Sequence, residues 1–245
     1  TTSVSAADLI TLDGKTTGMV NASAAAALSG AATAIAAVVT AAGVSLSGSE
    51  TVTLAETSLL AATLATIDGK TTGVVKATDA TTITGAASAV LSVVTSAGVS
   101  LSGSEALTLS DTTSVSAADL ITLDGKTTGK VNASAAAALS GAATAIAAVI
   151  TAAGVSLSGS ETVTLAETSL LAATLVTIDG ATTGTISAGK ATLLSGAMSD
   201  VLSVVTSAGV SLSGAELITL SNTGTVSAAD LITLDGKTTG MVNAS

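Results

Sequence analysis

The chain contains no Phe, Trp, Tyr, Pro, Cys or His, and its seven basic residues are all lysine, so it also lacks Arg. Without Cys and His it has no disulfide, no thiol chemistry and no ordinary zinc or copper site. Without Arg it has no bidentate guanidinium clamp for phosphate. It carries 17 acidic residues against 7 lysines, a formal net charge of −10. An acidic chain without aromatic side chains neither attracts a polyanion nor stacks bases, so we expect no nucleic acid partner.

The residues that are present form a tandem repeat. The string Val-Ser-Ala-Ala-Asp-Leu-Ile-Thr-Leu-Asp-Gly begins at Val4, Val115 and Val226, at a constant offset of 111 positions. Inside each block lies a looser duplication, marked by an Asp-Gly pair that recurs every 55 or 56 positions. We predict one continuous array over residues 1–245, because a fixed period of this kind indicates stacked repeats rather than separate globular domains. Its blocks are 1–111, 112–222 and a partial block at 223–245, and each full block holds two sub-repeats.

Neither end of the array carries the polar capping repeat that solenoids normally need to cover their open core. We therefore expect the sequence to be an excerpt of a longer chain. Open ends of similar sequence are expected to associate end to end, or with other repeats of the same chain, and such a contact propagates as a fibre.

One unit contains two segments with the pattern of a strand. In residues 16–23, Val20 and Ala22 are apolar in every copy, whereas the position between them varies from Asn21 to Lys76. Fixed apolar positions alternating with variable ones are typical of a half-buried strand. Residues 51–54 show the same alternation, with apolar side chains at positions 52 and 54 predicted to face inward and the threonine at 53 to face outward.

Two further segments are predicted to be helical. Apolar residues from Leu28 to Ala42 recur at helical spacing, and Ser29 is the expected N-cap of this helix. The glycine after it is expected to adopt the left-handed conformation of a Schellman motif; it recurs at Gly43, Gly98, Gly154 and Gly209. The second helix begins with a capping box formed by Ser5 and Asp8 and ends at Gly14.

Strand, helix, strand and helix then follow one another in each unit. One strand–helix pair is too small to bury its own apolar face, but stacked coils of about 25 residues solve this problem. The sequence therefore predicts a right-handed α/β solenoid with a parallel sheet. The competing fold is an all-β solenoid with Ala-rich turns.

The acidic residues are the main candidates for a site. Aspartates follow the second helix of each unit and glutamates precede the second strand. They are Asp13, Asp68, Asp124, Asp179, Asp235, Glu50, Glu105, Glu161 and Glu216. An Asx turn near Thr16 would explain Asp13, and a calcium ladder is the alternative. Calcium needs about six to eight oxygen ligands, and one Asp and one Glu per unit supply few of them. We therefore expect no metal and no cofactor.

Other functional classes receive less support from the residues. Gly14-Lys15-Thr16 resembles the end of a phosphate-binding loop, but the glycine that the motif requires five positions earlier is Leu9. The uncharged segment 16–49 is too rich in Ser, Thr and Gly, and too poor in flanking cations, for a membrane span. Catalysis is not expected, because Ser, Thr and Lys occur without His and the same residues recur every 55 or 56 positions. The outward threonine at 53 leaves ice binding as a remote alternative.

The motifs also carry a family resemblance that covers the whole chain. They are Leu-Ile-Thr-Leu-Asp-Gly-Lys-Thr-Thr-Gly, Leu-Ser-Gly-Ala-Ala and Ala-Gly-Val-Ser-Leu-Ser-Gly-Ser-Glu. This pattern resembles the tandem repeats of giant surface and motility-associated proteins of bacteria, especially marine cyanobacteria. The resemblance implies an extracellular structural protein that forms a rigid rod or filament on the cell surface. The alternative is an adhesin stalk that binds glycan or mineral surfaces through its repeated sheet face.

Overall fold

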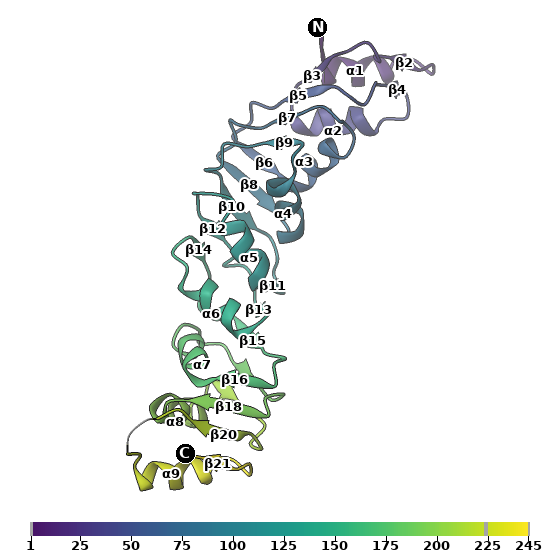
Figure 1. Ribbon diagram of the computed structural model, residues 1–245. Coiled ribbons are helices and arrows are strands. Elements are labelled where there is room, and N and C mark those ends of the chain that lie inside the picture. Colours follow the sequence, from purple (N-terminus) through teal and green to yellow (C-terminus); the bar gives the residue numbers. More distant parts are fainter. Residues whose placement is uncertain (1, 223–224, 245) are drawn as a thin grey trace. The chain divides into compact units, whose positions relative to one another are not determined.

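The computed structural model describes residues 2–222 and 225–244. Thr1 and Ser245, the two ends of the predicted array, lie outside the described residues, as do Thr223 and Gly224. The chain forms two compact units. The first unit comprises Thr1–Ser110 and Thr122–Asn132, and the second comprises Asp111–Ile121 and Ala133–Ser245. Figure 1 shows that helices and short strands alternate throughout both units.

Short helices of eight residues alternate along the chain with long helices of nine. The short helices are α1 (Ala6–Asp13), α3 (Ala61–Asp68), α5 (Ala117–Asp124), α7 (Ala172–Asp179) and α9 (Ala228–Asp235). The long helices are α2 (Ala32–Thr40), α4 (Ala87–Thr95), α6 (Ala143–Thr151) and α8 (Met198–Thr206). Each helix and its flanking residues form one coil, termed a short-helix coil or a long-helix coil below.

Short strands flank these helices. The strands before short helices are β1 (Ser3–Ser5), β6 (Ser58–Leu60), β11 (Ser114–Ser116) and β16 (Ser169–Leu171). The strands after short helices are β2 (Val20–Asn21), β7 (Val75–Lys76), β12 (Val131–Asn132), β17 (Ile186–Ser187) and β21 (Val242–Asn243). Long helices are preceded by β3 (Ala27–Ser29), β8 (Thr82–Gly85), β13 (Ala138–Ser140) and β18 (Leu193–Gly196), and followed by β4 (Val44–Ser45), β9 (Val99–Ser100), β14 (Val155–Ser156) and β19 (Val210–Ser211). One more strand follows each long-helix coil: β5 (Thr51–Thr53), β10 (Ala106–Leu109), β15 (Thr162–Thr164) and β20 (Leu217–Leu220).

All strand pairs are parallel, and the chain alternates between two sheets as it advances. In the first unit, β1, β3, β5, β7 and β9 pair in this order, and β6, β8, β10 and β12 form a second sheet. In the second unit, β11, β13, β15, β17 and β19 form one sheet, and β16, β18, β20 and β21 form another. Each new sheet therefore starts at the strand before a short helix, while the strand after that helix still joins the previous sheet.

The register of the sheets sets the length of one coil. Val4 lies opposite Leu28, and Leu28 lies opposite Val52, so the chain returns to the same place in the sheet after 24 positions. A repeat unit consequently holds two coils and one additional strand, such as β5 or β10.

A single loop explains why the spacing of the units alternates between 55 and 56 positions. The step from Val52 to its sheet partner Val75 is one position shorter than the equivalent step from Leu107 to Val131. The difference lies in the loop that follows these strands. The inward residue of β6 follows Val52 of β5 by one position fewer than the inward residue of β11 follows Leu107 of β10.

The core is a column of aliphatic side chains contributed by both kinds of helix and by strands such as β5 and β7. Val52 and Val75 from the strands, Ile35 from a long helix, and Leu64 and Ile67 from a short helix are each 0% exposed. Figure 1 shows the helices α1 to α4 following one another along the first unit. Burial of these small side chains against neighbouring coils replaces the large aromatic core of a globular domain.

These observations confirm the predicted α/β solenoid-like fold with parallel strands, and the helices exclude the all-β alternative. The facing of the strands is also confirmed, because Val52 and Leu54 are buried while Thr53 is exposed. The predicted number of strands is wrong. Each complete unit has five short strands distributed over two sheets, instead of two strands in one sheet.

The prediction of one helix from Leu28 to Ala42 is also wrong at its start. Leu28 is buried, but it lies in β3, where it pairs with strands on both sides. Gly30 has a φ of +134°, which no residue inside a helix adopts, and the helix begins only at Ala32. The predicted strand at 16–23 is shorter as well, because only Val20–Asn21 forms β2.

Candidate functional site

The first set of candidate acidic residues lies in buried turns that follow the long-helix coils. Glu50 is 1% exposed, and its Oε1 accepts hydrogen bonds from the Ser47 amide at 2.6 Å and the Ser47 hydroxyl at 2.7 Å. Gly48 lies at the tip of this turn with a φ of +76°, a conformation that glycine adopts without steric cost. Equivalent turns surround Glu105, Glu161 and Glu216. These carboxylates are therefore bound by donors of their own turns.

The same turns support the next short-helix coil. The Thr71 hydroxyl donates to the Glu50 carbonyl at 2.6 Å, and the Thr72 amide donates to the Gly48 carbonyl at 2.8 Å. Gly73 packs so closely on the Glu50 carbonyl that a Cβ atom would overlap it. The threonine–carbonyl bond recurs from Thr127, Thr182 and Thr238 at 2.6, 2.7 and 2.7 Å. A short-helix coil thus rests on the turn of the preceding long-helix coil.

The second set of candidates, the aspartates, joins each short-helix coil to the long-helix coil that follows it. Asp68 ends α3, and its Oδ2 accepts a hydrogen bond from the Ser96 hydroxyl at 2.7 Å. The Ser96 hydroxyl in turn accepts from the Gly98 amide at 3.0 Å. A Cβ atom on Gly98 would overlap Asp68 Oδ1, so only glycine fits at this position.

This aspartate–glycine contact is present in both units. Asp179 accepts a hydrogen bond from the Ser207 hydroxyl at 2.8 Å, and its Oδ1 occupies the space that a Cβ atom on Gly209 would need. Asp13 fills the same space at Gly43. In each case the glycine follows the aspartate by 30 positions, which places the two side chains in successive coils.

These contacts correct two predictions from the sequence. Gly43 and Gly98 do not adopt the left-handed conformation of a Schellman motif, since neither has a positive φ. They are glycines because an aspartate of the previous coil lies where a side chain would begin. The Asp68 carboxylate accepts a hydrogen bond from the Ser96 hydroxyl, 28 residues away, whereas in an Asx turn it would accept from an amide only a few residues further on. The turn near Thr16 is formed by the Thr16 hydroxyl, which accepts a hydrogen bond from Gly18 N at 2.9 Å.

The prediction that Ser29 caps the N-terminus of α2 is also wrong. The acceptor that takes its place was not predicted from the sequence. Ala32 N, the first amide of α2, donates to Glu56 Oε1 at 2.9 Å. Glu167 accepts from Ala143 N at 3.0 Å and Asn222 from Met198 N at 2.7 Å in the same way. The capping residue lies 24 residues further along the chain, in the next coil. The serine cap predicted for α1 is confirmed, because Asp8 N donates to the Ser5 hydroxyl at 3.4 Å, and α5 and α9 have the same bond. The short helices α3 and α7 begin without a side-chain cap.

The structure keeps the two sets of acidic residues in separate contacts. Within residues 2–222 and 225–244, no three Asp or Glu side chains come together as a metal site would require. Asp124 lies at the end of α5 and Asp235 at the end of α9. Asp235 lines a hollow.

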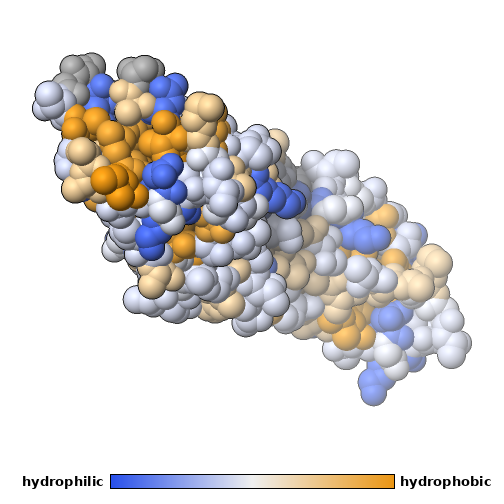
Figure 2. Space-filling view, turned by 90° about the horizontal axis from the view of Figure 1, so that it is seen from below, coloured by the Kyte–Doolittle hydropathy of each residue, from blue (hydrophilic) through white to orange (hydrophobic). Residues whose placement is uncertain are grey.

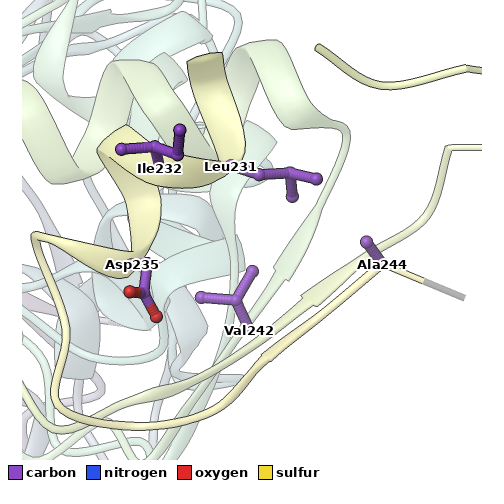
Figure 3. A pocket seen from close by; sticks show the side chains of 5 residues that line it. All are labelled: Leu231, Ile232, Asp235, Val242 and Ala244. Atoms are coloured by element: carbon purple, nitrogen blue, oxygen red, sulfur yellow. The ribbon is translucent and has the colours of Figure 1, made fainter. Parts of the chain in front are cut away.

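This hollow lies at the C-terminal end of the second unit and has a volume of 350 Å³. Figure 3 shows Leu231, Ile232 and Asp235 from α9 facing Val242 and Ala244 from the β21 segment across it. Figure 2 shows that apolar side chains gather on this end of the molecule. The hollow is therefore an apolar surface with one carboxylate at its margin.

None of the helices in the described part of the chain combines the length and the apolarity that crossing a bilayer requires. Comparison with known proteins finds no family model, no curated protein and no solved structure that matches the chain.

Proposed function

We propose that the chain is part of an extracellular structural repeat protein that forms a rigid rod or filament on the cell surface and has no enzymatic role. The observation that carries this proposal is the recurrence of one set of contacts between coils. The threonine–carbonyl bond occurs four times in the part of the chain that the structure describes, within 2.6–2.7 Å. A contact repeated with such constant geometry allows coils to be added without changing the structure of those already stacked.

The placement of each contact supports rigidity. Long-helix coils are joined to the preceding short helix by the aspartate–glycine contact, and short-helix coils rest on the buried glutamate turn. Movement of one coil against the next would break buried hydrogen bonds, which is costly when no water replaces them. The recurrent sites of this chain are therefore used to hold coils together.

The extracellular location rests on the resemblance of the repeats and on composition. A chain without Cys needs no control of its redox environment. A chain without Arg or aromatic residues offers few sites to trypsin-like or chymotrypsin-like proteases, which suits an exposed polymer.

The length of the particle tests this proposal. Parallel strands lie about 4.8 Å apart, and a coil takes about 24 residues, so duplicating the block 112–222 should lengthen the particle by about 22 Å. Small-angle scattering of the 245-residue chain and of the chain with one duplicated block would measure the change in maximum dimension at constant cross-section. An increase in cross-section instead of length would contradict a rod.

An adhesin stalk is the second candidate, and one observation favours it. The outward residues Ser5, Ser29 and Thr53 lie in register on one sheet, so hydroxyl groups recur at the strand spacing. A regular row of hydroxyls suits hydrogen bonding to glycans or to a mineral lattice. Cosedimentation with polysaccharide and mineral particles tests this function, and a double S29V/T53V variant should lose the binding.

Ice binding, the remote alternative, receives no comparable support. A flat threonine array would have to continue from sheet to sheet. In the sheet of β16, β18 and β20, the residues equivalent to Ser5, Ser29 and Thr53 are Leu171, Ser195 and Thr219, so a leucine interrupts the row.

A further inference from the structure

We propose that the hollow beside α9 is a docking site for one long-helix coil of the same repeat, and that Asp235 selects this coil by requiring a glycine opposite its carboxylate. This inference rests on the proposed function, because it names the partner that each stacking surface accepts. The occupant would be a coil with the sequence of residues 24–49, either from the same array or added in trans.

The chain shows what covers this surface elsewhere. The octapeptide Ala-Ala-Asp-Leu-Ile-Thr-Leu-Asp forms α1, α5 and α9. In α5 the residue equivalent to Leu231, Leu120, is 0% exposed, and Val131, the equivalent of Val242, is also 0% exposed. Leu231 and Val242 are instead both half-exposed. The hollow is therefore one half of a contact that is complete at the other positions.

Three complete contacts identify the other half. The helices α2, α4 and α8 pack against α1, α3 and α7, the short helices that precede them in the chain. Each of these long-helix coils places a glycine against the aspartate that ends the short helix, namely Gly43, Gly98 and Gly209. By the same geometry, Asp235 requires a glycine in the coil that docks on α9.

A second short-helix coil does not meet this requirement. Val20 of β2 and Val44 of β4 lie opposite each other in register, so Met19 holds the position in a short-helix coil that Gly43 holds in a long-helix coil. A methionine side chain would begin where the aspartate carboxylate lies.

Binding of a labelled peptide to the full chain tests the proposal. A fluorescein-labelled peptide of residues 24–49 is titrated with the 245-residue chain, and fluorescence anisotropy reports binding. We expect saturable binding by this peptide and at least tenfold weaker binding by its Gly43→Val variant. A peptide of residues 1–23, from a short-helix coil, should also bind at least tenfold more weakly.

The site on the chain is tested by a matched pair of variants. Asp235→Ala removes the carboxylate that the glycine has to accommodate, so this chain should bind the Gly43→Ala peptide as well as the unmodified one. Asp8→Ala is the control, because it also removes one negative charge, but from an exposed position on α1. The Asp8→Ala chain should still bind the Gly43→Ala peptide more weakly than the unmodified peptide, as the unmodified chain does.

Two results would overturn the inference. One is equal binding of the 24–49 and 1–23 peptides, and the other is absence of binding by the 24–49 peptide while circular dichroism shows the chain folded. Neither result would affect the change in particle length that tests the rod, so failure of the docking site and failure of the proposed function are distinguishable.

Discussion

At the scale of single residues, the structure depends on small side chains in fixed places. The core contains no aromatic ring, so each inward position contributes one aliphatic side chain with little spare volume around it. Glycine is needed where neighbouring coils approach most closely, and acidic residues provide acceptors for donors inside the stack. Substitutions should therefore differ sharply between adjacent positions.

Val75 and Lys76 are neighbours with opposite facing in β7. Val75 is 0% exposed and Lys76 is exposed. Val75→Asp places an unpaired charge in the core and should lower the free energy of unfolding by about 3–5 kcal/mol. Lys76→Asp should change it by less than about 0.5 kcal/mol, as usual for a surface substitution. Denaturant unfolding followed by circular dichroism measures both, and equal losses would show that the assigned facing is wrong.

Gly98 should tolerate no side chain because of Asp68. Gly98→Ala forces a Cβ atom onto the carboxylate and should cost about 1–3 kcal/mol, the usual effect of overpacking. Gly189 is the control, since a Cβ atom there meets no atom within 4 Å, and Gly189→Ala should be neutral or slightly stabilising. Adding Asp68→Ala to Gly98→Ala should restore part of the lost stability in thermal unfolding. Without such recovery, the two residues would not interact as described.

A chelator should leave the melting temperature of the chain unchanged. Glu50 Oε1 is already bound by an amide and a hydroxyl of its own turn, and Asp68 Oδ2 by the Ser96 hydroxyl. Thermal unfolding with EDTA and with added calcium provides the measurement. A clear rise in melting temperature with calcium, reversed by EDTA, would support the calcium ladder instead.

At the scale of secondary-structure elements, each coil completes the one before it. The first amide of a long helix has no partner inside its own coil and needs an acceptor at the helix N-terminus. Glu56, Glu167 and Asn222 supply this acceptor from the following coil. Long helices are therefore finished only when the next coil has folded, which couples the formation of neighbouring coils.

Replacing Glu56 tests this coupling. Glu56→Ala should destabilise α2 by about 1 kcal/mol, the usual cost of a lost N-cap, although the substitution lies outside the helix. Glu56→Gln keeps an acceptor oxygen and should retain most of the stability, as Asn222 does at the equivalent position of α8. Hydrogen exchange at the Ala32 amide is the direct readout and should accelerate in the alanine variant alone. Unchanged exchange in both variants would mean that this bond does not cap α2.

At the scale of the whole molecule, two kinds of coil alternate and their contact surfaces are not interchangeable. The aspartate–glycine contact joins a long-helix coil to a preceding short one, and the threonine–carbonyl contact joins a short-helix coil to a preceding long one. Each kind of coil therefore presents a contact surface that fits the other kind.

Features that depend only on neighbouring residues can be predicted from the sequence alone. The repeat period, the presence of helices, the inward facing of Val52 and the capping box at Ser5 all follow from local patterns, because periodicity and capping act within a few residues.

Tertiary structure decided the features that depend on contacts between coils. The length of one coil, the division of five strands between two sheets, the cap at Glu56 and the glycine at 43 all involve partners in successive coils. The repeat period does not reveal these pairs, because it is not a whole number of coils, so equivalent residues of successive units are not the ones that meet. Gly43 looked like a helix terminator in the sequence, and only the position of Asp13 in the previous coil shows why no other residue fits.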